Sequence, residues 1–407
     1  MKNLPVLFSL AWRNLWRNPN RTLVTFVVVA VALYSVLVLG AAMDAWARSS
    51  RDANLNLLTG SGQIHAKGYL NNPTVSYRMP EPDKSLTQAL NDPAISGWAS
   101  RVRVPAVIQS EYKTLPLILV GIVPEREQHI STISHQISAG QYLTSPDDRG
   151  IVLGAHLAKR LKTRLGKRVV VMAQTRDGHM AEQAFQVIGL FAGNQEVQDN
   201  YTFVGLNTAR HMLDIGEDIS EISFTIAHEQ LLDTTIHRLR QAAPSLDVAS
   251  WRILSPMTSA IDVLMQGMVY IWLLVMCAFM AIGVTNTQLM AVFERVREFG
   301  LLLALGMRPR QILTQVLLES ALLIGCGVLA GMGAATATIL ALHDGINLSF
   351  LAQGAEYLGS GHVLYPQLAP DQLLTLSVIV WILGVIVALW PAYRASHSNP
   401  VEAMHHV

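Results

Sequence analysis

Cysteine and charge are scarce in this chain of 407 residues. It has 2 cysteines and 14% charged residues, whereas about 25% charged residues is usual in soluble domains. Cys277 and Cys326 both lie in apolar runs, which argues against a disulfide framework in an exported domain. The formal net charge of +1 argues against a nucleic-acid binder, because binding phosphates needs a concentrated basic face. With 51% hydrophobic residues, the composition predicts a membrane protein.

Long apolar runs define the predicted transmembrane helices. A helix of about 20 apolar residues crosses the roughly 30 Å hydrocarbon core of a bilayer. Runs of this kind cover residues 23–43, 264–284, 316–342 and 373–390. Only the third run contains a charged residue, Glu319. The predicted fold is therefore a membrane protein with four transmembrane α-helices, arranged as one plus three around a large inserted segment.

The distribution of basic residues predicts the orientation, because Lys and Arg accumulate on the cytoplasmic side of membrane helices. They precede the first run and fill the link between the second and third runs, whereas the link between the third and fourth has none. The cytoplasmic segments are therefore predicted to be residues 1–22, 285–315 and 391–407, and the extracytoplasmic segments residues 44–263 and 343–372. A cleaved signal peptide is the alternative for the first run, but the leader and apolar core are too long for one.

The segment 1–22 is predicted to contain an amphipathic helix. Its apolar residues recur at helical spacing and are Phe8, Ala11, Trp12, Leu15 and Trp16. A helix of this kind lies on the inner leaflet, although the same face could rest on neighbouring spans. A disordered basic leader is less favourable, because it would leave two tryptophans on one face in water.

Residues 44–263 are predicted to form an extracytoplasmic α+β domain of two lobes. Strand-like runs separated by turn signals cover residues 101–110, 115–123, 169–173 and 185–191, and helical patterns cover residues 83–90, 155–165 and 234–242. This alternation favours an α+β domain over a repeat or a barrel. Periodicity does not place the boundary between the lobes.

The sequence has no recognisable catalytic motif. Its 13 histidines do not occur at zinc-ligand spacing, and it contains neither the nucleophile motif GxSxG nor the phosphate-binding loop GxxxxGK[ST]. We therefore expect no enzymatic activity, catalytic residue, metal or cofactor in this chain. If it depends on ATP, a partner subunit binds the ATP and Mg.

The link 285–315 contains an apolar cluster. Residues 301–305, with the sequence LLLAL, lie between Gly300 and Gly306 and have charged residues on both sides. An apolar cluster with a charged rim at the membrane face is suited to insertion into a groove on another protein. A short interfacial turn resting on lipid fits the residues equally well.

Several motifs follow one another along the chain. They are residues 10–22 (LAWRNLWRNPNRT), 294–306 (ERVREFGLLLALG), 391–403 (PAYRASHSNPVEA) and the stretch 151–189 in the extracytoplasmic domain. Together they resemble the FtsX-like permeases, the class that includes MacB and the LolC/LolE lipoprotein-releasing permeases. The resemblance covers essentially the whole chain, including the one-plus-three arrangement of spans. Leu303 departs from the pattern, because the family often has a basic residue there.

The resemblance implies a permease subunit of an ABC transporter in the bacterial inner membrane, with the large domain in the periplasm. Two permeases, either identical copies or sister chains, would bind a cytoplasmic ABC ATPase dimer. ATP-driven closure of that dimer would push on a coupling helix, and the second span with its extension at 257–268 would carry the motion outward. The coupling residues implied here are Glu294, Arg295, Glu298, Phe299, Gly300, Leu301, Leu302, Ala304, Leu305 and Gly306. The leucines would occupy the ATPase groove, and Glu294, Arg295 and Glu298 would contact its rim.

The resemblance leaves more than one function open. Residues 60–70 resemble lipoprotein-release permeases more than efflux permeases, which favours extraction or export of a hydrophobic or lipid-anchored substrate, with lipoproteins preferred. The expected partners are then a lipoprotein or periplasmic carrier, and membrane lipids. The alternatives are an FtsX-like force transmitter that regulates a periplasmic cell-wall hydrolase, and MacB-like efflux of peptides or drugs. An external segment of about 220 residues favours the first function.

Two features of the third span have competing interpretations. Glu319 is costly in a membrane, and we expect it to be a structural partner of a nearby Arg or backbone group more than a gate or relay. Gly327 and Gly331 form a GxxxG step, which allows helices to approach closely. We expect them to pack neighbouring spans together, with a place in a dimer seam as the alternative.

Overall fold

The computed structural model describes the chain except residues 1–10, 12, 15–16, 194, 348–362 and 397–407. The chain forms two compact units. The helical unit comprises residues 1–48, 262–352 and 362–407, and the second unit comprises residues 49–261 and 353–361. Each unit is built around its own hydrophobic clusters.

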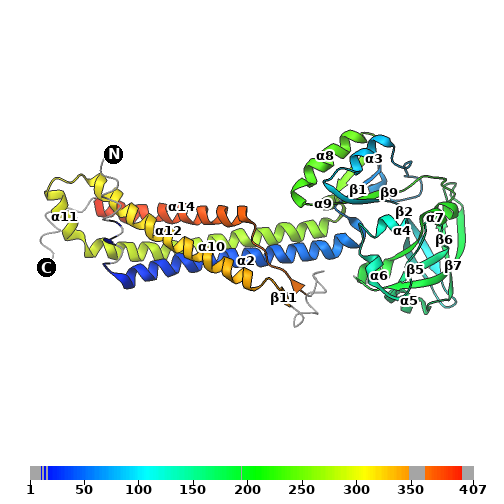
Figure 1. Cartoon of the computed structure of the whole chain (residues 1–407), viewed down its shortest axis with the longest axis horizontal. Helices are drawn as coiled ribbons and strands as arrows, with labels where there is room; N and C mark the ends of the chain where they lie inside the picture. Colours follow the sequence, from blue (N-terminus) through cyan, green and yellow to red (C-terminus); the bar gives the residue numbers. More distant parts are fainter. Residues whose placement is uncertain (1–10, 12, 15–16, 194, 348–362, 397–407) are drawn as a thin grey trace. The chain divides into compact units, whose positions relative to one another are not determined.

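Long helices lie side by side in the helical unit (Figure 1). They are α2 (Pro19–Asn54), α10 (Pro256–Glu294), α12 (Pro309–Ala341) and α14 (Pro370–Ser396). Among the described residues, these 4 helices are long and apolar enough to cross a membrane. The shortest, α14, has 27 residues, which gives a length of about 40 Å at 1.5 Å per residue and exceeds the hydrocarbon core. The short elements of this unit are α11 (Val296–Ala304), β11 (Ile346–Asn347) and β12 (Val363–Leu364).

The helices extend beyond the predicted spans at most ends. The exception is the C-terminal end of the third predicted span, because its last residue, Leu342, is the C-cap of α12 and lies just beyond the helix. The fourth continues through Pro391 to Ser396, so the predicted cytoplasmic tail 391–407 begins inside the helix. The remainder of that tail, and most of the predicted loop 343–372, lie outside the described residues.

Glycines allow α12 to approach α2 closely. A Cβ atom added to Gly327 would lie 2.9 Å from the Cβ of Val29, and one added to Gly331 would lie 2.7 Å from the carbonyl oxygen of Ala30. Both distances are shorter than van der Waals contact, so only glycine fits without a shift of the backbone. The GxxxG step therefore lies between the first and third spans of the same chain.

The second unit contains both strands and helices. Its strands are β1 (Gly62–Ala66), β2 (Ile95–Gln109), β3 (Thr114–Ile122), β4 (Ile137–Gly140), β5 (Gly150–Gly154), β6 (Arg168–Gln174), β7 (Met180–Phe191), β8 (Tyr201–Gly205), β9 (Glu221–Ile226) and β10 (Leu246–Ser250). Its helices are α3 (Lys84–Leu90), α4 (Pro124–Glu127), α5 (Ala155–Leu161), α6 (Gln195–Asn200), α7 (Leu206–Leu213), α8 (Leu232–Ala242) and α9 (Trp251–Leu254). The π-helix and 3-10 segments are η1 (Leu55–Thr59), η2 (Tyr69–Asn71), η3 (Ile133–Gln136) and η4 (Glu229–Leu231). The helix predicted over residues 155–165 is too long, because Lys162 adopts a left-handed conformation (φ 54°) that ends α5.

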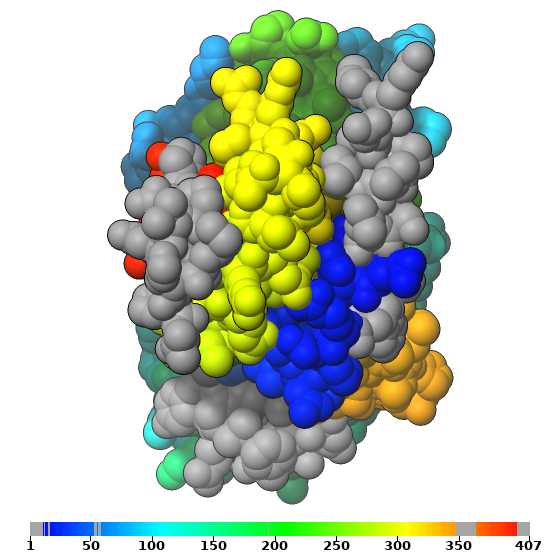
Figure 2. All heavy atoms as spheres, turned by 90° about the vertical axis from the view of Figure 1, so that its left-hand side faces the viewer, coloured from blue at the N-terminus to red at the C-terminus, as the bar shows by residue number. Residues whose placement is uncertain are grey.

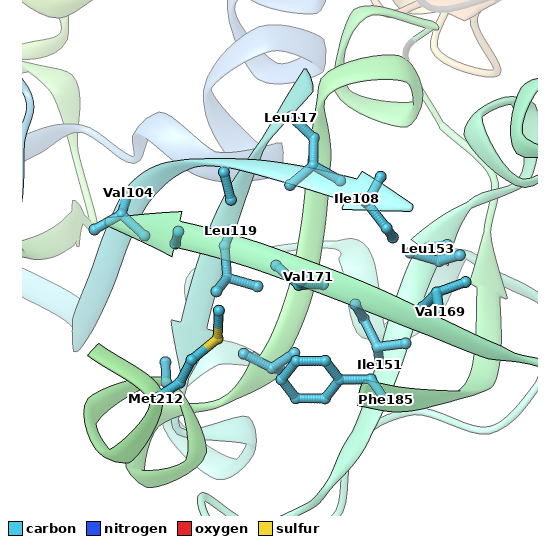
Figure 3. Close-up of a cluster of buried hydrophobic side chains, with 14 of the residues drawn as sticks. Val104, Ile108, Leu117, Leu119, Ile151, Leu153, Val169, Val171, Phe185 and Met212 are labelled. Carbon is cyan, nitrogen blue, oxygen red and sulfur yellow. The ribbon is translucent and has the colours of Figure 1, made fainter. Parts of the chain in front are cut away.

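The strands of the second unit divide into two lobes. Strands β10, β1, β9 and the first half of β2 form the small lobe, with α3 and α8 packed against its core. In the large lobe each strand pairs with the next in the order β2, β3, β8, β5, β7, β6, and β6 pairs again with β2. This ring of hydrogen-bonded strands encloses apolar residues that include Leu119, Val171 and Phe185 (Figure 3). The expectation against a barrel is therefore wrong for the large lobe, because its strand pairing closes.

Strand β2 belongs to both lobes and marks their boundary. Its residues 95–101 pair with β9, and its residues 101–109 pair with β3. Arg101 is the residue at which the pairing changes. Because the small lobe is built from chain segments on both sides of the large lobe, periodicity along the sequence could not place this boundary.

A buried cluster of charged residues occupies the boundary. Arg101 is fully buried, and its guanidinium donates two hydrogen bonds to the Glu127 carboxylate, at 3.0 and 2.7 Å, and another to the carbonyl of Leu58 in η1. It also donates to Glu221 across 3.3 Å. Burial by itself raises the pKa of Glu221, but His65 and the neighbouring arginines outweigh it and lower that pKa to about 2. The cluster joins both lobes to the segment that follows α2.

Candidate functional site

The link between the second and third predicted spans folds into a short helix with defined ends. Arg295 interrupts the helical path between α10 and α11. At the other end, Gly306 adopts a left-handed conformation (φ 94°), and the N–H groups of Gly306 and Met307 donate to the carbonyls of Leu303 and Leu302 at 3.0 Å each. This hydrogen-bond pattern is a Schellman motif, which favours glycine at its left-handed position. Pro309 then begins α12.

The helix α11 has one buried and one exposed face. Phe299 and Gly300 are buried, and Phe299 packs in a cluster with residues of α10, α12 and α14. Leu301 and Leu305 are 58% and 76% exposed, and their i, i+4 spacing places them on the same face. Ala304 is exposed between them. Figure 2 shows the atoms of this helix, in yellow, protruding at the surface beside the blue N-terminal segment.

Ion pairs connect α11 and the end of α10 to the N-terminal segment. Arg17 donates to both carboxylate oxygens of Glu298, at 2.5 and 3.2 Å, and Arg21 donates to Glu294 at 2.7 Å. The hydrogen bond from Arg17 lowers the pKa of Glu298, and it raises that of Arg17. Exposed ion pairs are individually weak, but these two pairs, one helical turn apart, connect α11 and the end of α10 to the first turn of α2 and the residues just before it.

A second set of contacts connects α11 to the third span. Arg295 donates to Glu319 at 2.8 Å, and Asn14 donates to the other carboxylate oxygen of Glu319 at 2.6 Å. The expectation that Glu319 is a structural partner of a nearby Arg is confirmed. Arg295 is buried between Glu319 and the ring of Phe299, and its contact with the rim of a partner groove stays a prediction.

The predicted coupling residues therefore have three different environments. Leu301, Ala304, Leu305 and Gly306 are exposed, Leu302 is half-buried, and Arg295, Phe299 and Gly300 are buried. Glu294 and Glu298 are exposed but already paired with arginines of the same chain.

Sequence reasoning did not identify Asn14, Arg17 and Arg21 as parts of this site. The signal that could have found them is the complementary charge of two short segments predicted to lie on the same side of the membrane. Most of the predicted amphipathic face, namely Phe8, Trp12, Leu15 and Trp16, lies outside the described residues. Of that face the structure describes Ala11, which is buried. Across the described ranges, no group of three or more His, Cys, Asp and Glu residues is placed to hold a metal ion.

Comparison with protein families identifies the class of protein. A family model for the MacB-like periplasmic core domain matches residues 22–242, which is more than half of the chain. A model for the FtsX-like permease C-terminal region matches residues 270–400. The chain belongs to the FtsX/MacB-like permeases. It is therefore a multi-pass membrane permease with a periplasmic domain, and family membership implies an ABC transporter system with a partner ATPase.

Individual relatives of this FtsX/MacB-like permease cover most of its length. It is 24% identical over 341 residues to the lipoprotein-releasing system transmembrane protein LolC of Xylella fastidiosa (strain 9a5c), covering 79% of this chain and 80% of the relative. It is 22% identical over 405 residues to LolC of Neisseria meningitidis serogroup B, covering 95% and 94%. The pyoverdine export ATP-binding/permease protein PvdT of Pseudomonas fluorescens (strain Pf0-1) is 24% identical over 97% of this chain, which spans 58% of PvdT.

Proposed function

We propose that this permease transmits ATP-driven motion to its periplasmic domain in order to extract or export a hydrophobic or lipid-anchored substrate, with lipoproteins as the preferred cargo. The full-length similarity to a LolC protein, in which 95% of this chain and 94% of the relative align, supports the choice of cargo. The similarity to PvdT supports the wider class of hydrophobic substrates.

The exposed leucine face of α11 carries the proposal. Leu301 and Leu305 lie on a helix whose opposite face is packed into the membrane helices. A partner ATPase subunit would receive these two side chains in an apolar groove, burying surface that water now covers. Because Phe299 holds the other face in the cluster with α12 and α14, a push on α11 would move the membrane helices instead of only bending the link.

The long second helix supports transmission to the periplasmic side. Helix α10 has 39 residues, which is about 58 Å at 1.5 Å per residue. This length is almost twice the thickness of the hydrocarbon core. The helix begins at Pro256, so the 257–268 extension is helical and contiguous with the second span.

Replacing Leu301 and Leu305 by Asp tests the coupling assignment. The double variant places two carboxylates where an apolar groove would have to desolvate them. We expect co-purification of the ATPase subunit with the affinity-tagged permease to fall at least about tenfold, which corresponds to roughly 1.4 kcal/mol. Co-purification would be measured in lipid nanodiscs by quantitative mass spectrometry.

The control is Leu165→Asp, which makes the same type of substitution at a leucine that is 37% exposed in the periplasmic domain. This variant should retain the ATPase. Normal ATPase recovery with the Leu301 and Leu305 double variant, at equal membrane insertion, would contradict the assignment of α11 as the coupling helix.

The cargo requires a separate measurement. The permease would be purified together with an ATPase subunit that binds but does not hydrolyse ATP, and the co-purifying proteins would be identified. Lipid-modified proteins or a periplasmic carrier would support extraction of lipoproteins. A complex containing only a cell-wall hydrolase or its activator would overturn the proposed cargo in favour of force transmission.

A further inference from the structure

A cleft separates the two lobes of the periplasmic domain. Its volume is about 880 Å³, within the range of sites that enclose small organic ligands. All of its lining residues lie between Leu58 and Ile261 and therefore belong to the second unit. The coupling site on α11 uses none of them.

One wall of the cleft is apolar and open to solvent. Ile253 of α9 is 58% exposed and Met257 at the start of α10 is 75% exposed. They face the cleft together with Leu58, Ile118 and Val197. Exposed apolar side chains gathered at the mouth of a cleft are typical of ligand-binding sites.

The floor of the cleft is polar and contains an unsatisfied histidine. His65 is fully buried, its ring stacks on Tyr69 at 4.9 Å, and its Nε2 lies 3.1 Å from Oε1 of Gln63. The amide of Gln63 is oriented by its donation to the carbonyl of Thr59, so Oε1 accepts and Nε2 of His65 carries the proton. Nδ1 of His65 has no hydrogen-bond partner in the described part of the chain, and the side chain is closed to solvent.

Arg103 lies beside this histidine in the cleft lining. Its side chain is 29% exposed, and its guanidinium lies over the ring of Tyr201 at 5.3 Å and donates to the hydroxyl of Tyr201 at 2.8 Å. It is also 3.6 Å from a carboxylate oxygen of Glu221, which balances its charge. The floor therefore offers donors from Arg103, whose charge the Glu221 carboxylate balances.

We propose that this cleft binds an amphiphile with an acyl chain and an uncharged ester or amide head group. The acyl chain lies against Ile253 and Met257, and a carbonyl oxygen of the head accepts from Arg103. Both a diacylglycerol lipid and the lipid anchor of a lipoprotein have this chemistry. The inference deepens the proposed function by giving the hydrophobic cargo a site in the periplasmic domain.

The test uses the full chain in lipid nanodiscs and a monoacylglycerol with a photoreactive diazirine on its acyl chain. After illumination, labelled peptides would be identified by mass spectrometry. We expect labels on cleft peptides, including residues 253–261. Met257→Glu should reduce this labelling about tenfold or more, because the acyl chain would have to bury a carboxylate. Arg103→Gln should raise the probe concentration needed for half-maximal labelling about tenfold, the expected effect of losing a charged donor.

Met180→Glu is the matched control, because Met180 is 65% exposed in the same domain but does not line the cleft. Equal labelling of the cleft in the Met257→Glu and Met180→Glu variants would overturn the proposal, as would labels confined to the membrane helices. Competition by unlabelled monoacylglycerol or by a triacylated lipopeptide supports the site, and stronger competition by the lipopeptide identifies the anchor as the ligand. Competition by an alkyltrimethylammonium amphiphile, which has neither a donor nor a carbonyl, would overturn the head-group assignment.

The two proposals fail separately. Met257→Glu should leave ATPase co-purification unchanged, and the Leu301 and Leu305 double variant should leave labelling of the cleft unchanged. Absence of cleft labelling in the wild type, with the expected loss of ATPase in the double variant, would overturn only the cleft assignment. Cleft labelling in the wild type, with normal ATPase recovery in the double variant, would overturn only the coupling assignment.

Discussion

Removing Arg101 should destabilise the periplasmic domain more than removing any exposed arginine. The Arg101 guanidinium is fully buried and donates two hydrogen bonds to Glu127, one to Glu221 and one to the carbonyl of Leu58. Arg101→Met leaves two buried carboxylates without their shared cation. Loss of one member of a buried ion pair typically costs about 3–5 kcal/mol, so this variant should lose stability in that range.

The assay is hydrogen–deuterium exchange of the β2 amides in the full chain in nanodiscs. Core amides of β2 exchange when the domain unfolds. A loss of about 3–5 kcal/mol in the free energy of unfolding should therefore accelerate their exchange roughly a hundred- to several-thousand-fold. The control is Arg238→Met, because Arg238 is 52% exposed in its pair with Asp92 and such pairs contribute about 0–1 kcal/mol.

A double variant separates the ion pair from general loss of packing. Arg101→Met combined with Glu127→Met replaces the pair by apolar groups of similar size, which is often neutral or stabilising. We therefore expect the double variant to exchange more slowly than Arg101→Met alone. The reasoning is refuted if Arg101→Met exchanges no faster than Arg238→Met, or if the second substitution restores no protection.

Three further predictions concern charge and helix packing. Because the pKa of Glu221 is lowered to about 2, the stability it contributes is complete above about pH 5 and is lost as the pH falls towards 2; thermal unfolding of Glu221→Gln should depend less on pH in that interval than unfolding of the wild type. Gly331→Ala should lower the thermal midpoint of the full chain, because the added Cβ would meet the backbone oxygen of Ala30. A Cβ added to Gly333 would have no atom within 4 Å, so Gly333→Ala should leave the midpoint unchanged. Arg17→Glu should weaken crosslinking between engineered cysteines flanking the contact with Glu298, and the exchanged pair Arg17→Glu with Glu298→Arg should restore it; no recovery would mean that the pair does not hold these segments together.

Features encoded within one stretch of sequence were predictable. The apolar runs at 23–43 and 373–390 lie within α2 and α14, because crossing a bilayer requires a continuous apolar helix. The turn after α11 has a local signal in Gly306 and Pro309, which occupy the left-handed position and the first turn of the next helix. A local signal also has limits, because nothing in the pattern of residues 155–165 shows that Lys162 ends the helix.

Contacts between distant segments were not predictable from periodicity. Arg17 and Glu298 are 281 residues apart, and each alone is an ordinary charge on a solvated helix. The closure of the large lobe depends on β6 pairing with both β2 and β7, which is a property of register and not of any single strand. The polar floor of the cleft likewise combines His65 of β1 with Arg103 of β2.

Two charged residues at α11 already form ion pairs within the chain, and this limits what a partner ATPase can recognise there. Glu298 is bound by Arg17 inside the chain, and Arg295 is buried against Glu319, so a partner must break existing contacts to use either one. Leu303, where the resemblance to the family led us to expect a basic residue, is half-buried in the cluster around Phe299. This departure therefore changes internal packing and not the docking face. Of the predicted coupling residues, Leu301, Ala304, Leu305 and Gly306 are exposed and do not pair with a charge, and the fit of the two leucines to a groove depends on shape and apolar burial more than on charge.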